Sequence, residues 1–159
     1  MKTLFLLRHA KALLYSQNNS DIDRPIADDG KREAELVGEL LIKKKEFPQL
    51  IISSSALRTI TTAKIVAKKI NYPEKEIIIN ENIYDASSEK LQTIIQNTDP
   101  KINSLMLVGH NPGISDLIDD ITDSIFGYLP TAGLVCLKKD TQSWDDIYGK
   151  WILKYNYHP

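Results

Sequence analysis

The chain has 159 residues, of which 42% are hydrophobic and 26% charged, and its formal net charge is −1 at pH 7. This length and composition are typical of one globular domain, spanning residues 1–159, that buries its own core. The charge balance argues against a nucleic-acid partner, which requires a basic stripe. No apolar stretch approaches the roughly 18 residues that a membrane span needs, and the single cysteine, Cys136, leaves no internal disulfide. We therefore expect a cytoplasmic protein that binds neither nucleic acid nor a membrane.

Short apolar runs alternate along the chain with segments of helical periodicity. In chain order, the pattern predicts a strand at 4–7, a polar loop at 15–23, a helix at 28–45, a strand at 50–52, a helix at 56–70 capped by Ser55, a strand at 77–79, a helix from 87, a strand at 104–108, a helix from 114, and strands at 134–137 and 151–155. Alternating strands and helices are typical of an α/β fold with a mostly parallel sheet between two helical layers. The last two strands have no helix between them, so at least one pairing is predicted to be antiparallel.

Three of the predicted strands are followed by cationic or imidazole side chains. Arg8 and His9 follow the first strand, Arg58 lies shortly after the second, and His110 follows the fourth. If these strands are parallel neighbours, their carboxyl ends meet at one edge of the sheet, where α/β proteins bind ligands. Two guanidinium groups in one cleft repel each other unless an anion lies between them, and their planar forks match phosphate oxygens.

Each histidine alone is more often structural or solvated than catalytic, and Arg58 alone is more often a helix-surface residue. Arg8 is harder to dismiss, because it directly follows the apolar run at 4–7. Together these residues favour a phosphate site with a nucleophile, because a neutral imidazole can take up a phosphoryl group and divide one displacement into two easier steps. We predict that one ring nitrogen of His9 donates to a backbone carbonyl, which would fix the tautomer. Nothing in the sequence has convincing metal-ligand spacing, so we expect neither a metal nor a cofactor.

Five separated segments resemble the signatures of the histidine phosphatase superfamily, whose familiar form contains an RHG motif, and within it the SixA phosphohistidine phosphatase branch. The segments are Leu7-Arg8-His9-Ala10, Asp23-Arg24-Pro25-Ile26, Ser54-Ser55-Ala56-Leu57-Arg58-Thr59, Ile83-Tyr84-Asp85-Ala86 and Val108-Gly109-His110-Asn111-Pro112. They occur in the family's order, and the resemblance extends from residue 2 to about residue 155.

The resemblance implies a three-layer α/β/α fold like that of phosphoglycerate mutase and a metal-independent phosphatase. It implies that His9 is the nucleophile that becomes phosphorylated and that Arg8 and Arg58 grip the phosphoryl group. His110 matches the second histidine, which contacts the phosphoryl oxygens. These roles suit phosphoryl transfer, which needs positioning and charge compensation more than new covalent chemistry.

The sequence departs from the family pattern at one position, and it does not identify the general acid. Ala10 replaces the glycine of the RHG motif, so we expect an ordinary backbone conformation there. Glu81 stands nearest to the carboxylate that protonates the leaving group in many relatives. A solvated charge at a strand end explains Glu81 equally well, and Asp21 and Asp23 are alternatives. A phosphohistidine substrate would relax the need for an acid, because its leaving group is an imidazole.

Three functions fit these observations. The preferred one is the removal of phosphate from phosphohistidine in a partner protein, since the short connections leave no insertion that could close over a small metabolite. The first alternative is a phosphomonoesterase for a small metabolite, which would require Glu81 as a true acid. The second is a phosphate- or phosphoprotein-binding module without turnover, which would have no need of a nucleophile at His9.

Overall fold

A six-stranded mixed sheet with helices on both faces organises the protein in the computed structural model, which describes residues 1–159. The elements are β1 (Lys2–Arg8), α1 (Asp28–Lys44), β2 (Leu50–Ser53), α2 (Leu57–Lys69), β3 (Ile78–Ile79), α3 (Ser88–Gln96), β4 (Ser104–Gly109), α4 (Gly113–Thr122), β5 (Leu134–Lys139) and β6 (Ile152–Tyr157). None of these helices combines the length and apolar character that crossing a membrane requires.

The strand order is β3-β2-β4-β1-β5-β6. The first four strands in this order are parallel to one another, whereas β5 runs antiparallel to both β1 and β6. The predicted three-layer α/β/α architecture, mostly parallel with an antiparallel pairing near the C-terminus, is therefore confirmed.

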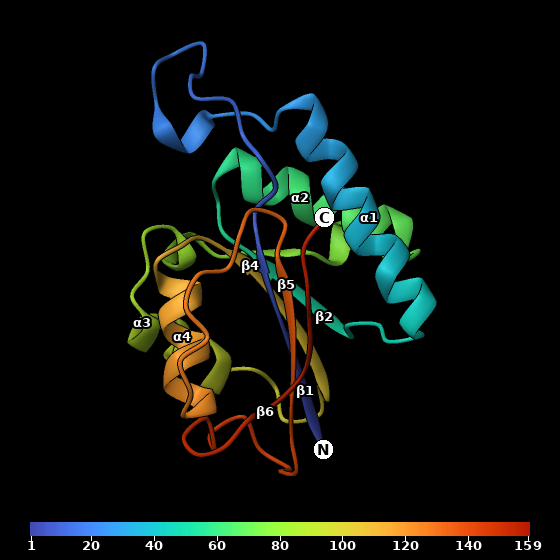
Figure 1. The fold of residues 1–159 in the computed structure, drawn as a ribbon, viewed down its shortest axis with the longest axis vertical. Coiled ribbons are helices and arrows are strands. Elements are labelled where there is room, and N and C mark those ends of the chain that lie inside the picture. The colour runs from blue at the N-terminus through green and yellow to red at the C-terminus, as the bar shows by residue number, and fades with distance from the viewer.

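Alternating side chains of the central strands form two separate cores. In β1, Leu4 and Leu6 belong to the cluster beneath α3 and α4, and Phe5 and Leu7 belong to the cluster beneath α1 and α2. Figure 1 shows the two helix pairs on opposite sides of the sheet. Because strand side chains point alternately to the two faces, a continuous apolar run is what a strand covered on both sides needs.

The register of β1 and β4 determines where the site lies. Arg8 pairs with Gly109, so His9 and His110 leave the sheet at neighbouring positions. The backbone N–H of His9 donates to the carbonyl oxygen of Gly109 at 3.1 Å. The strand β2 pairs with the other side of β4, which brings its carboxyl end to the same edge.

The structure differs from the prediction mainly at element ends. The N-cap of α2 is Ala56 and makes no side-chain cap bond, so the prediction of a Ser55 cap is wrong. Oγ of Ser54 accepts from the backbone N–H of Ala56 at 3.3 Å, which stabilises the turn before the helix but is not a cap of its first turn. The strand β3 has only two residues, and β5 and β6 extend beyond their predicted ends.

Candidate active site

Four side chains predicted from the sequence meet at the carboxyl edge of β1, β2 and β4. The ring centroids of His9 and His110 are 5.4 Å apart. Nη2 of Arg58 is 3.5 Å from Nδ1 of His110. Arg8 ends β1 directly before His9, and its charge acts on both imidazole rings. The structure therefore brings together both histidines and both arginines, although they come from three distant segments of the chain.

His9 is held in the form that a nucleophile needs. Its side chain is buried, and its Nδ1 lies 2.8 Å from the carbonyl oxygen of Ala10. A carbonyl only accepts, so Nδ1 carries the proton and Nε2 keeps a free lone pair. Burial lowers the pKa of His9 to about 4, against the opposing effect of the Ala10 bond and with help from Arg58 and Arg8. The predicted ring-to-carbonyl bond is confirmed, and the ring is neutral at pH 7.

Ala10 fits its position without the freedom of glycine. It is fully buried and is absent from the residues with positive φ, as predicted. Its backbone N–H donates to Oγ1 of Thr62 at 3.0 Å, and the Thr62 hydroxyl donates to the carbonyl oxygen of Arg58 at 2.7 Å. The helix α2 therefore fixes the backbone beside the nucleophile while it also presents Arg58.

His110 is neutral for similar reasons. Its Nε2 lies 2.8 Å from Oγ of Ser54, and the ring of Tyr84 packs edge-on at a centroid distance of 5.5 Å. Burial lowers the pKa of His110 to about 3, and the charges of Arg58 and of a protonated His9 act in the same direction.

Each of the two arginines keeps an N–H group that has no hydrogen-bond partner. Nη1 of Arg8 donates to the hydroxyl of Tyr128 at 2.6 Å and to the carbonyl oxygen of Leu129 at 3.1 Å. Arg58 donates to the Asp21 backbone at 2.8 Å and to its carboxylate at 3.1 Å. The Nε atoms of both arginines are buried and have no hydrogen-bond partner. Buried donors are nearly always paired in native proteins, so unpaired guanidinium N–H groups beside two imidazole rings suit an anionic ligand.

Comparison with known proteins identifies the family. Residues 4–102 match the model of the histidine phosphatase superfamily, branch 1. The chain belongs to the histidine phosphatase superfamily.

Similar proteins place this histidine phosphatase in the SixA branch. The structure of a proposed phosphohistidine phosphatase SixA from Agrobacterium tumefaciens is 28% identical, has a TM-score of 0.82, and covers 99% of this chain and 98% of that one. A SixA protein histidine phosphatase complexed with tungstate shares the fold at 18% identity, with a TM-score of 0.85 and coverage of 98% and 96%. An uncharacterized chloroplastic protein of Arabidopsis thaliana is 28% identical over 96% of this chain and 76% of its own. The family match and the similar solved structures together support phosphatase activity on a phosphorylated substrate.

Asp21 is the one carboxylate that this histidine phosphatase places in contact with its site residues. It lies in a 3₁₀ turn at Asp21–Asp23 and accepts from the Tyr84 hydroxyl at 2.6 Å and from Arg24 at 3.0 Å, in addition to Arg58. The hydrogen bonds from Tyr84 and Arg24 hold the pKa of Asp21 well below its usual range, and Arg58 adds to the effect. A carboxylate held as an anion is a poor proton donor at neutral pH.

The other two candidate acids lie apart from the site residues. Glu81 is exposed on the 3₁₀ turn Glu81–Ile83, and its side chain makes no hydrogen bond or ion pair. Asp23 is exposed and accepts from the Asn18 amide at 2.7 Å. The catalytic role of Glu81 remains a prediction. No group of three or more His, Cys, Asp and Glu side chains is arranged to hold a metal ion.

Several site contacts were not assigned from the sequence. Tyr84 and Arg24 lie in segments that carry the family resemblance, so the motif could have indicated them, but nothing in their spacing points to Asp21. Thr62 looks like an ordinary polar residue of an amphipathic helix. Tyr128, whose ring centroid is 5.1 Å from the guanidinium carbon of Arg8, lies in an irregular connection between α4 and β5, where periodicity carries no signal.

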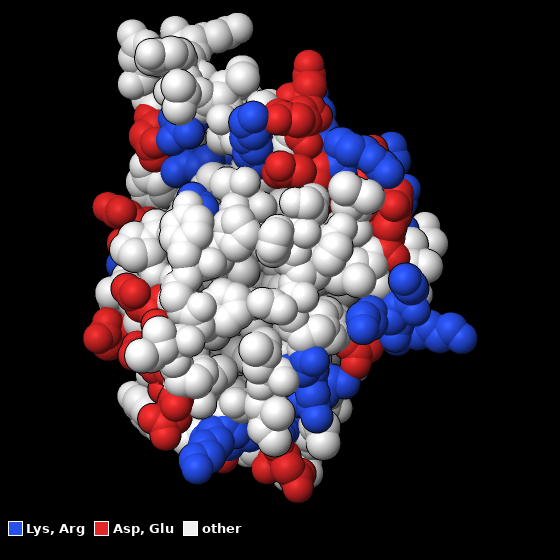
Figure 2. Space-filling view, in the orientation of Figure 1, with Lys and Arg blue, Asp and Glu red and all other residues white.

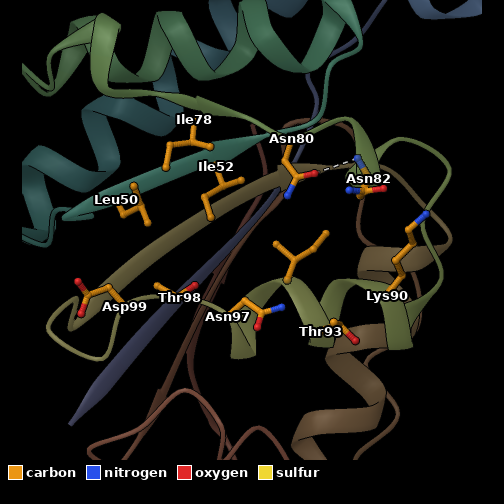
Figure 3. A pocket seen from close by; sticks show the side chains of 11 residues that line it. Leu50, Ile52, Ile78, Asn80, Asn82, Lys90, Thr93, Asn97, Thr98 and Asp99 are labelled. Atoms are coloured by element: carbon orange, nitrogen blue, oxygen red, sulfur yellow. Dashed lines mark hydrogen bonds between the residues drawn. The ribbon is translucent and has the colours of Figure 1, made fainter.

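A separate cavity of about 540 Å³ lies at the β2–β3 edge of the sheet. Its apolar lining comes from Leu50, Ile52, Ile78 and Ile94, and amide, hydroxyl and charged side chains surround this lining (Figure 3). It contains no histidine or arginine, so it lacks the groups that phosphoryl transfer requires, and we locate the chemistry at the histidines.

Proposed function

We propose that the protein is a metal-independent phosphohistidine phosphatase, which removes phosphate from a phosphohistidine side chain of a partner protein. The observation that carries the proposal is the neutral His9 ring. Its Nε2 is free to attack, and it lies among guanidinium groups whose buried Nε–H donors have no partner. This arrangement combines a nucleophile with the charge compensation that a transferring phosphoryl group needs.

The reaction then has two displacements at phosphorus. Nε2 of His9 forms a bond to phosphorus while the bond from phosphorus to the substrate imidazole breaks, and the departing nitrogen keeps the electron pair and takes a proton from solvent. Water then attacks the phosphoryl group on His9, and the bond to Nε2 breaks. Phosphate leaves, and Nε2 recovers its lone pair. Arg8, Arg58 and His110 stabilise charge on the phosphoryl oxygens in both steps.

The state of the carboxylates supports a substrate whose leaving group needs no acid from the enzyme. Asp21 is held as an anion by three donors, and Glu81 makes no contact with the site residues. An alkoxide leaves badly without a proton. The imidazole of phosphohistidine departs more readily, so an enzyme for it can work with a poorly placed acid.

The surface beside the site supports a protein as the carrier of the phosphohistidine. The connection after β1 exposes 49% of Leu13, 76% of Leu14 and 75% of Tyr15. It projects beyond the helices in Figure 1, and in Figure 2 it forms a mostly uncharged protrusion with acidic and basic side chains at its base. Clustered apolar side chains at a surface are typical of protein contacts.

The test compares two substrates. We expect turnover of a phosphoramidate, or of a phosphohistidine peptide, to exceed that of a general phosphomonoester, and to be unchanged by a metal chelator. Glu81→Gln should leave phosphoramidate turnover intact. Glu76→Gln is the matched control, because it makes the same change on the neighbouring exposed turn at Glu74–Glu76.

Other results would favour the alternatives. Efficient phosphomonoester hydrolysis that Glu81→Gln abolishes would indicate a small-metabolite phosphatase with a true general acid. A protein that binds phosphate but never acquires an acid-labile, base-stable phosphoryl group would be a binding module. A chelator that stops turnover would contradict metal independence.

A further inference from the structure

We propose that Ser54 is the positioning residue for His110, holding the imidazole by Nε2 so that Nδ1 faces the phosphoryl site. The inference rests on the proposed function only in that it assigns His110 to the phosphoryl oxygens. Ser54 lies at the end of β2 and is fully buried, and its Oγ is 2.8 Å from Nε2 of His110.

The backbone of Ser54 is fixed by three contacts, which makes its hydroxyl a stable reference point. Its N–H donates to the carbonyl oxygen of Val108 at 3.0 Å, directly across the sheet. Its own carbonyl oxygen accepts from the hydroxyls of Ser53 and Thr59, each at 2.9 Å. Ser54 therefore ties the end of β2 to β4 and to the first turn of α2.

The neighbours of the His110 ring determine its tautomer. Arg58 faces Nδ1 at 3.5 Å, and a guanidinium group can only donate. In the neutral ring Nδ1 is therefore the acceptor, and Nε2 carries the proton and donates to Oγ of Ser54. This assignment accounts for both contacts at once, and Ser54 also accepts from the backbone N–H of Ala56.

A hydroxyl suits this place because it can accept or donate. A phosphoryl oxygen only accepts, so His110 must present an N–H at Nδ1 when the anion is bound. If the ring gains a proton at Nδ1, Nε2–H continues to donate to Ser54. If the proton instead moves from Nε2 to Nδ1, the Ser54 hydroxyl donates to Nε2. The ring orientation is preserved in both cases, whereas a methyl group would hold neither form.

The first measurement uses the intact protein and needs no substrate. The chain has three histidines, so removing the exposed His158 with His158→Gln simplifies the assignment of the imidazole nitrogens by NMR. We expect the free protein to show His110 as the tautomer with the proton on Nε2. A neutral His110 with its proton on Nδ1 would overturn the proposal, whatever the enzyme turns over.

The second measurement compares two buried serines. Ser54→Ala should mix the tautomers of His110, weaken the binding of inorganic phosphate, and lower kcat by about ten- to hundredfold, since small misplacements of a catalytic group cost this much. Ser88→Ala is the matched control, because Ser88 is also buried and its hydroxyl donates to the Asp120 carboxylate rather than to His110. Ser54→Thr, which keeps the hydroxyl, should restore the tautomer.

The comparison between the variants decides the outcome. An unchanged His110 tautomer in Ser54→Ala, or equal losses of kcat in both alanine variants, would overturn the proposal. A wild-type protein that shows the expected His110 tautomer but releases no phosphate from a phosphoramidate would contradict the proposed function and leave the role of Ser54 intact.

Discussion

Two cations at opposite ends of β1, the buried Lys2 and the half-buried Arg8, have contrasting environments. At the start of the strand, the Lys2 ammonium donates to the carbonyl oxygens of Pro100 and Ile102 and to Oδ1 of Asn103. At the end of the strand, the Arg8 guanidinium has contacts at Nη1, and its buried Nε has no partner. Lys2 has one acceptor for each of its three ammonium hydrogens, whereas Arg8 retains a donor.

The difference separates a structural cation from a binding one. A buried charge is tolerated when its hydrogen bonds are complete, as at Lys2. At the carboxyl edge, Asp21 is the single carboxylate that contacts Arg24 and Arg58, and Arg8 contacts no carboxylate. The excess positive charge and the unpaired donors there disfavour the empty site and favour an anion. Substitutions at the two ends of the sheet should therefore affect different properties of the protein.

The largest effect is expected from removing the nucleophile at the catalytic end. His9→Ala should abolish turnover and phosphoryl labelling, because no other imidazole occupies its place, while inorganic phosphate still binds to the arginines. Turnover and acid-labile label are measured together with phosphate affinity. His158→Ala, which removes an exposed histidine near the C-terminus, should change none of them. A phosphoryl label on His9→Ala would mean that another residue is the nucleophile.

Removing one guanidinium should have the next largest effect. Arg58→Ala should lower kcat/KM by about 10²- to 10³-fold, similar to the loss of one preorganised donor to a transition-state oxyanion. Arg58→Lys should recover only part of the rate, because it keeps the charge and loses the planar fork. Lys68→Ala provides the control, since it removes an exposed cation of the same helix whose ammonium group makes no hydrogen bond or ion pair. A loss of less than about tenfold would contradict phosphate recognition by Arg58.

The lowered pKa of His9 predicts a smaller effect, which appears in the pH dependence of kcat/KM. His9 attacks as the neutral ring, and its pKa is lowered from 6.5 to about 4. We expect kcat/KM to be level from neutral pH down to about pH 5 and to fall about tenfold per unit below about pH 4, as protonation removes the nucleophile. NMR titration of the His9 ring provides the direct check. An acid limb near pH 6.5 would contradict the buried environment.

Protonation of these histidines also bears on stability. Their folded-state pKa values lie below the ordinary value, so the unfolded chain binds protons more readily. The stability that the neutral rings contribute is fully present above about pH 6.5 and is lost progressively as pH falls toward the folded-state values. The kinetic measurement therefore needs a parallel record of the folded fraction at each pH.

The sequence allowed the catalytic edge to be predicted because its residues follow continuous apolar strands. The runs that end before Arg8 and His110 are buried on both faces, so their strand assignment and shared edge follow from periodicity and chain order. The partners of Asp21 were not predictable in this way. The loop that carries Asp21 has no periodicity, and its contacts with Arg58 and Tyr84 join positions 37 and 63 residues away. The prediction of a Ser55 cap failed for a related reason, since the geometry of the β2–α2 turn leaves α2 without a side-chain cap and directs the Ser54 hydroxyl to the N–H of Ala56.

Lys2, at the start of β1, shows the same limit of prediction from the sequence. A lysine beside the N-terminal methionine looks like a solvated charge in the sequence, yet it is 1% exposed. Its burial depends on carbonyls near residue 100, and Trp144 lies 5.5 Å from its ammonium. The pairing of β1 with β4 brings these groups together, and composition alone cannot indicate it.

The smallest effect on activity is expected at Lys2, where the cost should fall on stability instead. Lys2→Met leaves the Pro100 carbonyl and the Asn103 amide oxygen without their donor, whereas the Ile102 carbonyl keeps the indole N–H of Trp144 at 2.8 Å. The loss of these hydrogen bonds from a charged donor should lower the free energy of unfolding by about 1.5–3 kcal/mol, as measured by denaturant titration. Lys154→Met, at an exposed position of β6, should change it by less than about 0.5 kcal/mol. The kcat of folded Lys2→Met should equal that of wild type, and a loss comparable to that of Arg58→Ala would show that the two ends of β1 are energetically coupled.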